Sequence, residues 1–166
     1  MTLSEFNELP KDEALSALYA CCHCQTWAKR VAERRPFPSF EKLLTTAKCF
    51  WSGAEDEQIL EAFSGHARIG DIELLRSRYA GLATHEQGQV LSASEVVIRE
   101  LYRLNREYEA KNGFIFIVCA SGKSAEEMLA LLRSRINNPR IVEMQNGARE
   151  QGEITRLRIA TLIDTD

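Results

Sequence analysis

The segment with the clearest chemical potential is a short loop that carries a histidine. His66 directly follows Gly65, and Asp71 begins the next predicted helix after a second glycine, Gly70. Glycine commonly ends helices, so the sequence predicts an imidazole at the bend between two helices. Histidine titrates near neutral pH, and loops held by rigid helices often carry chemistry. His66 is therefore a candidate for proton transfer, although a single loop histidine is more often structural.

A second polar cluster precedes the longest predicted helix. Thr84, His85, Glu86 and Gln87 are consecutive there. The first turn of a helix exposes free N–H groups that favour an anionic ligand, so Glu86 and Gln87 could contact a substrate. A capping box formed by Thr84 and Gln87 explains the same residues without any ligand.

Near the C-terminus, Arg158 lies on or beside the apolar side of a predicted helix. Ile154, Thr161 and Leu162 share its face at helical spacing. A buried guanidinium needs a carboxylate or an anionic ligand. Glu86 would satisfy it as an internal partner, and an anionic substrate would satisfy it equally well, so both interpretations stay open.

Two other motifs favour structural interpretations. Gly122-Lys123-Ser124 is similar to the end of a phosphate-binding loop, but Ile117 occupies the position that would need glycine. Ser124 and Glu127 instead match a capping box. The cysteines of Cys21-Cys22-His23-Cys24 lack a second pair of zinc ligands and the βαβ pattern of a redox site, so we expect core thiols with His23 at the surface or a helix end.

Helical spacing of apolar residues dominates the chain and predicts the elements that must position these groups. The run 114–119 resembles a strand, but a single strand cannot satisfy its own backbone, so we expect a buried connector or a first helical turn. The fold prediction is an all-α, single-domain bundle of about eight or nine helices over residues 1–166. Predicted helices cover 3–8, 11–22, 25–34, 39–51, 55–64, 71–80, 85–110, 124–137 and 140–163.

Composition excludes several classes of function. The chain has 166 residues, which suits one domain, and its net charge of −3 offers no basis for binding nucleic acid or an anionic membrane. No apolar run approaches the roughly 20 residues that span a bilayer, and the first ten residues do not resemble a targeting signal. Five cysteines, an odd number, fit reduced thiols better than a disulfide framework. We therefore expect a cytoplasmic protein.

Several blocks in a consistent order make this sequence similar to a family of small all-α enzymes of urate breakdown. The family is that of the 2-oxo-4-hydroxy-4-carboxy-5-ureidoimidazoline (OHCU) decarboxylases. An ordered series of blocks over nearly the whole chain is more specific than any one motif. The blocks are Cys21-Cys22, Trp27-Ala28, Arg35-Pro36-Phe37, Ala62-Phe63, His66-x-x-Ile69-Gly70-Asp71, Glu86-Gln87, Leu104-Asn105, Tyr108, Gly113-Phe114-x-Phe116-Ile117 and Leu157-Arg158.

The resemblance implies functional residues at particular positions. It implies a catalytic histidine at His66, substrate contacts at Glu86 and Gln87, and a substrate-binding arginine at Arg158. Further pocket residues implied by the family are Ala67, Ala83, Thr84, His85, Ile117, Val118, Cys119, Ala120 and Ser121. This chain departs from the family in having Ala67 where proline is usual and Ala83 where serine is common. Ala67 could loosen the His66 loop, because proline fixes φ.

The implied activity is decarboxylation of OHCU to (S)-allantoin, without a cofactor or metal and in a homodimer. One alternative is a non-catalytic helical module that binds a purine-derived ligand or a partner protein. Another is a metal hydrolase that uses Cys21, Cys24 and His23.

Overall fold

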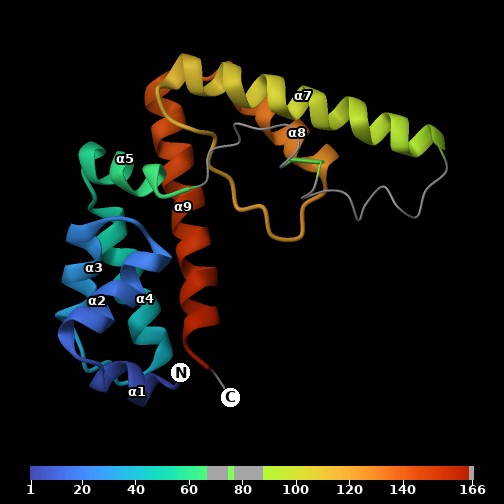
Figure 1. The fold of residues 1–166 in the computed structure, drawn as a ribbon. Helices are drawn as coiled ribbons and strands as arrows, with labels where there is room; N and C mark the ends of the chain where they lie inside the picture. The colour runs from blue at the N-terminus through green and yellow to red at the C-terminus, as the bar shows by residue number, and fades with distance from the viewer. Residues whose placement is uncertain (67–74, 77–87, 165–166) are drawn as a thin grey trace. The chain divides into compact units, whose positions relative to one another are not determined.

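The computed structural model of this chain describes residues 1–66, 75–76 and 88–164. Within these ranges the regular secondary structure is helical and no strand occurs, which confirms the all-α prediction (Figure 1). The helices are α1 (Leu3–Glu8), α2 (Lys11–Cys21), α3 (Gln25–Ala32), α4 (Phe40–Ser52), α5 (Asp56–Ser64), α7 (Gly88–Asn112), α8 (Ala125–Arg135) and α9 (Arg140–Leu162). The helix predicted near 71–80 lies mostly outside the described residues.

The predicted helix starts agree with the structure because local capping determines many of them. Ser39 accepts a hydrogen bond from the backbone N–H of Lys42 at the start of α4. Ser124 accepts one from Glu127 at the start of α8, which confirms that this serine caps a helix. The apolar run 114–119 is an irregular connector in which Phe114, Phe116 and Ile117 are buried, as predicted.

The chain divides into two compact units. The first comprises Met1–His66, Ile117–Cys119 and Met144–Asp166, and the second comprises Ala67–Phe116 and Ala120–Glu143. The first therefore holds α1 to α5 with most of α9, and the second holds α7, α8 and the first turn of α9. The prediction of one single domain stays a prediction.

The first unit packs its helices around an apolar core and along α9 (Figure 1). Phe6, Leu18 and Leu43 are fully buried there, and burying such a side chain contributes about 1.5–3 kcal/mol. Trp51 of α4 donates its indole N–H to the carbonyl of Ala148 in α9, with an N···O distance of 2.7 Å. This bond ties the N-terminal helices to the helix that carries Arg158.

Gly147 allows α9 to approach α5 closely. A Cβ atom at this position would lie 2.7 Å from Cζ of Phe63, well inside contact distance. Glycine inside a helix costs about 1 kcal/mol relative to alanine, so its presence here reflects packing and not helix propensity. Because α5 ends immediately before His66, this contact helps to define where the histidine lies.

The second unit contains a buried ionic network. The Glu143 carboxylate is fully buried and accepts hydrogen bonds from Tyr108 Oη at 2.6 Å, Arg135 Nε at 2.8 Å and Asn138 Nδ2 at 3.0 Å. Burial, together with the hydrogen bond to Glu143, raises the pKa of Tyr108. A buried charge is tolerated only when it is paired in this way, so the network joins α7, α8 and the start of α9.

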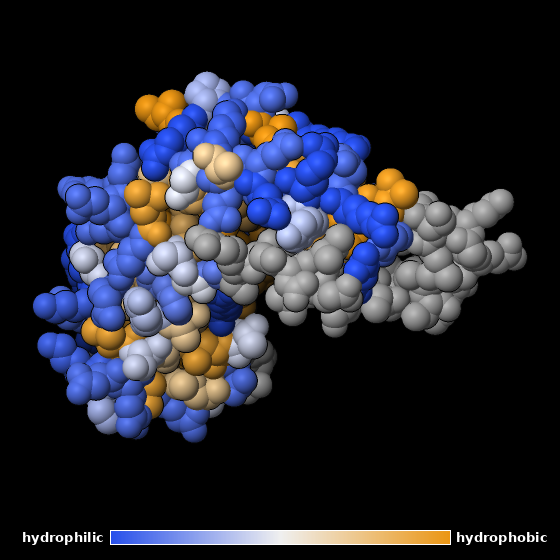
Figure 2. Space-filling model, turned by 45° about the horizontal axis from the view of Figure 1, so that its top comes forward, coloured by the Kyte–Doolittle hydropathy of each residue, from blue (hydrophilic) through white to orange (hydrophobic). Residues whose placement is uncertain are grey.

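The surface is mainly polar on the face seen in Figure 2, where small apolar areas interrupt a hydrophilic background. In the described part of the chain, the exposed large apolar side chains are Met1, Val96 and Ile141. None of the helices described here combines the length and apolarity that crossing a bilayer requires.

Candidate active site

His66 lies directly after the C-terminus of α5. Gly65 caps this helix, and the backbone N–H of His66 closes the last turn by donating to the carbonyl of Phe63 at 3.2 Å. The histidine is half-buried. The predicted position at a helix end is therefore confirmed, and the backbone on its N-terminal side is held by the helix.

A chain of hydrogen bonds connects the His66 ring to α9 and α2. Nε2 of His66 lies 2.5 Å from Oε1 of Gln151, a fully buried residue of α9. The amide nitrogen of Gln151 donates to Oγ1 of Thr155 at 3.0 Å, and this hydroxyl donates to the carbonyl of Cys21 at 3.5 Å. We call Gln151, Thr155 and the Cys21 carbonyl the relay.

Arg158 contacts the same backbone oxygen at which the relay ends. Its NH1 donates to the Cys21 carbonyl at 3.3 Å, so one backbone oxygen serves both the relay and the arginine. Arg158 is exposed, which corrects the expectation of a buried guanidinium: it borders the apolar face of α9 between the buried Thr155 and Ile159. An arginine can pack its stem on apolar surface while its head group stays in water. Because a guanidinium has five N–H donors, the others can meet an anionic ligand while NH1 stays bonded to the Cys21 carbonyl.

The surroundings of His66 favour the neutral form of its ring. Burial is the main cause that lowers its pKa, and the Coulombic influences of Arg158 and His23 act in the same direction. The hydrogen bond to Gln151 opposes them. A neutral imidazole near pH 7 has one N–H and one lone pair, so it can both donate and accept a proton.

His23 belongs to this environment, which sequence reasoning missed. Its ring stacks on Tyr19 with centroids 4.4 Å apart and planes 7° from parallel. It also packs so closely on Gly65 that a Cβ there would lie 2.2 Å from His23 Cγ. It lies between α2 and α3 and is partly buried, not simply a surface residue. Local sequence carried no signal for this contact with the His66 loop.

Gln151 and Thr155 were also missed, although the sequence held a signal for them. They precede Arg158 by seven and three residues, on one face of α9. Both are buried polar side chains on the apolar side of that helix. Polar residues at core positions usually have a specific hydrogen-bond partner, which here is the His66 ring.

The cysteines behave as core residues, as predicted. Cys21, Cys22 and Cys24 are buried, and burial raises the pKa of Cys21 to about 11 and of Cys22 to about 12. These thiols stay protonated near neutral pH and are poor nucleophiles. No group of three or more Cys, His, Asp or Glu residues in the described ranges is arranged to hold a metal ion. The metal-hydrolase alternative therefore has no supporting cluster there.

Other predicted site residues fall in different parts of the chain. Ile117, Val118 and Cys119 belong to the same compact unit as His66, whereas Ala120 and Ser121 belong to the other. Ile117 is buried and the two residues after it are half-buried. Six predicted residues lie outside the described residues: Ala67, Ala83, Thr84, His85, Glu86 and Gln87.

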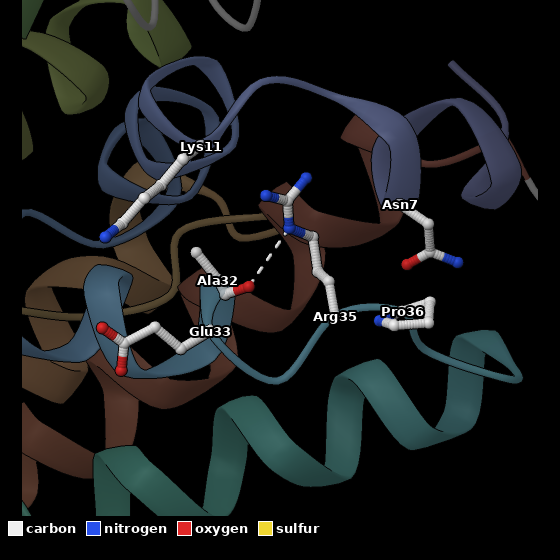
Figure 3. Close-up of a pocket in the computed structure, with 6 residues that line it drawn as sticks. All are labelled: Asn7, Lys11, Ala32, Glu33, Arg35 and Pro36. Carbon is white, nitrogen blue, oxygen red and sulfur yellow. Dashed lines mark hydrogen bonds between the residues drawn. The ribbon is translucent and has the colours of Figure 1, made fainter.

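One open pocket of about 350 Å³ occurs elsewhere in the first unit (Figure 3). Its lining residues are Asn7, Lys11, Ala32, Glu33, Arg35 and Pro36. Arg35 is already engaged: its Nε donates to the Ala32 carbonyl, and NH1 donates to the carbonyls of Phe6 and Leu9. This arginine has a structural role, and none of the described candidate residues lines the pocket.

The chain is similar to known proteins over nearly its whole length. It is 36% identical over 145 residues to the uric acid degradation bifunctional protein TTL of Arabidopsis thaliana, covering 86% of this chain and 45% of that protein. It is 25% identical over 161 residues to the 2-oxo-4-hydroxy-4-carboxy-5-ureidoimidazoline decarboxylase of Haloferax volcanii, covering 96% of this chain and 95% of that protein. The chain thus spans less than half of the plant protein and nearly all of the archaeal one.

A solved structure and a family model indicate the same family as these two relatives. A crystal structure of OHCU decarboxylase in the presence of (S)-allantoin matches with a TM-score of 0.69 at 34% identity, covering 87% of this chain and 94% of that chain. The family model described as OHCU decarboxylase matches residues 7–160. With this match extending from α1 to α9, and so across the helices that carry His66 and Arg158, the chain belongs to the OHCU decarboxylase family.

Proposed function

We propose that this chain decarboxylates OHCU to (S)-allantoin in urate degradation, with His66 as the proton-transferring residue. The observation that carries the proposal is a half-buried imidazole that hydrogen-bonds the buried Gln151 and is connected through Thr155 and the Cys21 carbonyl to an exposed arginine, in a chain of this family. A ring that is neutral near pH 7 can take up one proton and return it.

The substrate carries a carboxylate and a hydroxyl on one ring carbon, next to the carbon that bears the ureido group. When the bond to the carboxylate breaks, CO₂ leaves and its electron pair forms a double bond between the two ring carbons. The adjacent ring C=N bond takes up the displaced pair and its nitrogen gains a proton. The resulting enol then loses its hydroxyl proton and gains a proton at the ureido-bearing carbon, so the carbon that lost CO₂ becomes an amide carbonyl of the ring. Protonation on one face produces one enantiomer of allantoin.

The protein then needs to supply proton transfer, orientation and electrostatics. His66 removes the proton of the substrate hydroxyl and delivers one to the ureido-bearing carbon, a contribution worth about 10² to 10⁴-fold in rate. Arg158 binds an anionic or carbonyl oxygen through its planar fork. Glu86 accepts hydrogen bonds from substrate N–H or hydroxyl groups, and Gln87 contacts the ureido group or the ring amide. The segments 83–85 and 117–121, with Ala67, border the pocket.

The substrate's own ring accepts the electron pair of the broken bond, so the proposal requires no cofactor or metal. We further propose that the protein acts as a cytoplasmic homodimer and binds neither nucleic acid nor membrane. Size-exclusion chromatography with light scattering tests the dimer directly, because a monomer at micromolar concentration would contradict it.

The decisive experiment is a chiral assay of freshly generated OHCU. Spontaneous decay yields racemic allantoin, whereas the wild-type chain should yield the S enantiomer, measured by circular dichroism. His66→Asn should abolish the enantiomeric excess while the helical spectrum is retained. A folded H66N variant with undiminished stereoselective turnover would refute the role of His66. Binding of OHCU by the wild-type chain without turnover would refute the enzyme itself.

A paired substitution on α9 tests the arginine. Arg158→Lys should raise KM, because a point charge does not replace a bidentate fork. Arg156→Lys is the matched control, since Arg156 is also exposed and forms an ion pair with its helix neighbour Glu153 at 3.2 Å. Equal KM values for the two variants would contradict the substrate-binding role of Arg158.

A further inference from the structure

The hydrogen bonds that end at the His66 ring have a definite direction. The Cys21 carbonyl can only accept, so the Thr155 hydroxyl donates its proton to it. The same hydroxyl oxygen then accepts from the amide nitrogen of Gln151 at 3.0 Å. Cys22 also hydrogen-bonds Thr155 through its thiol, but sulfur is a weaker acceptor than a carbonyl oxygen and does not reverse this direction.

The direction determines which amide atom faces the histidine. With its nitrogen directed at Thr155, Gln151 presents Oε1 to Nε2 of His66 at 2.5 Å. An amide oxygen only accepts, so Nε2 must carry a proton. Rotating the amide by 180° would require the Thr155 hydroxyl to turn its proton from the Cys21 carbonyl to the amide oxygen, so the hydrogen bond to Cys21 would be lost. Because Gln151 is fully buried, water cannot replace the lost hydrogen bond.

We propose that Gln151 is a positioning residue that holds His66 in the tautomer with the proton on Nε2 and the lone pair on Nδ1. The inference rests on the proposed role of His66 and deepens it. Nδ1 is then the nitrogen that takes a proton from the substrate, and the imidazolium that forms returns it from the same atom. The fully buried amide keeps Nε2 from exchanging roles with Nδ1 during the reaction.

The charged and titratable groups facing His66 cannot choose the tautomer by themselves. Among the described residues these are Arg158 on α9 and His23 between α2 and α3, and both influences disfavour the imidazolium. They favour the neutral ring, which still has two possible tautomers. A specific hydrogen bond is needed to select one, and one neutral hydrogen bond shifts such an equilibrium about tenfold. Gln151 makes that bond from the core of the first unit.

The first test observes the tautomer directly. Wild-type protein with ¹⁵N-labelled histidine is studied by long-range ¹H–¹⁵N correlation NMR near pH 7, and the His66 signals are assigned by their absence from His66→Asn. We expect a protonated Nε2 and an unprotonated Nδ1. The opposite pattern would overturn the inference. This measurement needs no substrate, so it succeeds or fails independently of the proposed activity.

The second test perturbs the relay. Gln151→Leu removes the acceptor and should produce a mixture of tautomers, with kcat lowered about tenfold and KM changed little. Gln151→Glu restores an acceptor at Nε2–H, so it should recover part of kcat and move the acidic limb of the pH–rate profile to higher pH. A structural role alone would not produce this recovery or shift.

A milder pair of variants keeps the inference testable if Gln151→Leu does not fold. Thr155→Val removes the hydroxyl that orients the amide and should also mix the tautomers. Thr161→Val is the matched control, because this exposed threonine of α9 bonds, among the described residues, only to the carbonyl of Leu157. If His66→Asn abolishes turnover but Thr155→Val retains the wild-type tautomer and kcat, the inference fails alone. If His66→Asn retains turnover, the proposed function fails.

Discussion

Replacing Gly65 with alanine should distort the site through a single contact. The added Cβ would lie 2.2 Å from both Cγ and Nδ1 of His23 and 2.4 Å from its Cβ. Rotating the His23 side chain moves the ring but not its Cβ, so the backbone of one segment has to shift. The backbone of Gly65 itself is not the obstacle, because its φ of −77° suits alanine.

The magnitude follows from two opposing effects. Overpacking of this kind costs about 1–3 kcal/mol, whereas replacing glycine by alanine stabilises by about 0.4–1 kcal/mol through the unfolded chain. Because one of the clashing atoms is a rigid Cβ, we expect the upper part of the first range. The free energy of unfolding should therefore fall by about 2 kcal/mol, which lowers Tm by roughly 4–8 °C for a chain of this size.

Thermal and urea unfolding, followed by circular dichroism, measure this effect against a matched control. Gly53 also caps a helix with negative φ, but its added Cβ would meet only the Phe50 carbonyl oxygen at 3.9 Å. Gly53→Ala should leave stability unchanged or raise it by up to about 1 kcal/mol. Equal Tm changes for the two glycine variants would refute the reasoning.

A double-mutant cycle locates the clash. His23→Gly removes both the ring and the Cβ, so it should relieve most of the cost of Gly65→Ala. His23→Ala keeps the Cβ and should relieve less. Because His66 is the next residue, kcat/KM should fall in Gly65→Ala and recover in the variant with His23→Gly. Additive effects, with no coupling between positions 23 and 65, would contradict the contact.

Three further predictions concern other groups. Tyr108→Phe removes one donor to the fully buried Glu143 carboxylate and should lower the free energy of unfolding in urea by about 1–3 kcal/mol. Tyr102→Phe is the control: its hydroxyl is partly exposed, so the free energy of unfolding should change little. Burial lowers the pKa of His66, so the unfolded chain binds this proton more readily than the folded one. The free energy of unfolding should therefore fall as the pH drops below about 6.5. His66→Asn should reduce that loss, measured by unfolding curves taken between about pH 7.5 and 5. A thiol reagent should modify the exposed Cys49 in the native protein but reach the buried Cys21 and Cys22 only after denaturation. Rapid modification of Cys21 or Cys22 in the native protein would contradict their place in the core.

Local signals account for what the sequence predicted well. Helix starts such as Ser39 and Ser124 depend on a side chain and a backbone N–H three residues later, so both partners are visible in one short segment. The same holds for the position of His66, because Gly65 ends α5 next to it. The resemblance to the family identified Arg158, which the structure brings to the relay.

Residues missed by sequence reasoning act through distant contacts. Gln151 lies 85 positions from His66 along the chain, and Thr155 lies 134 positions from Cys21. No spacing rule connects such pairs, because their approach depends on how α9 packs against α2 and α5. Glycines take part in this packing: Gly65 makes room for His23, and Gly147 makes room for Phe63.

The exposure of Arg158 is another feature that the sequence alone could not predict. Periodicity along α9 correctly predicted that this arginine borders an apolar face, but it cannot tell a buried guanidinium from one that reaches into water. That difference depends on how far neighbouring helices cover the face. The sequence alone determined the helices, the family and the candidate positions for chemistry. Only the tertiary structure decided which polar groups meet, because a hydrogen bond between distant segments needs both of them packed in place.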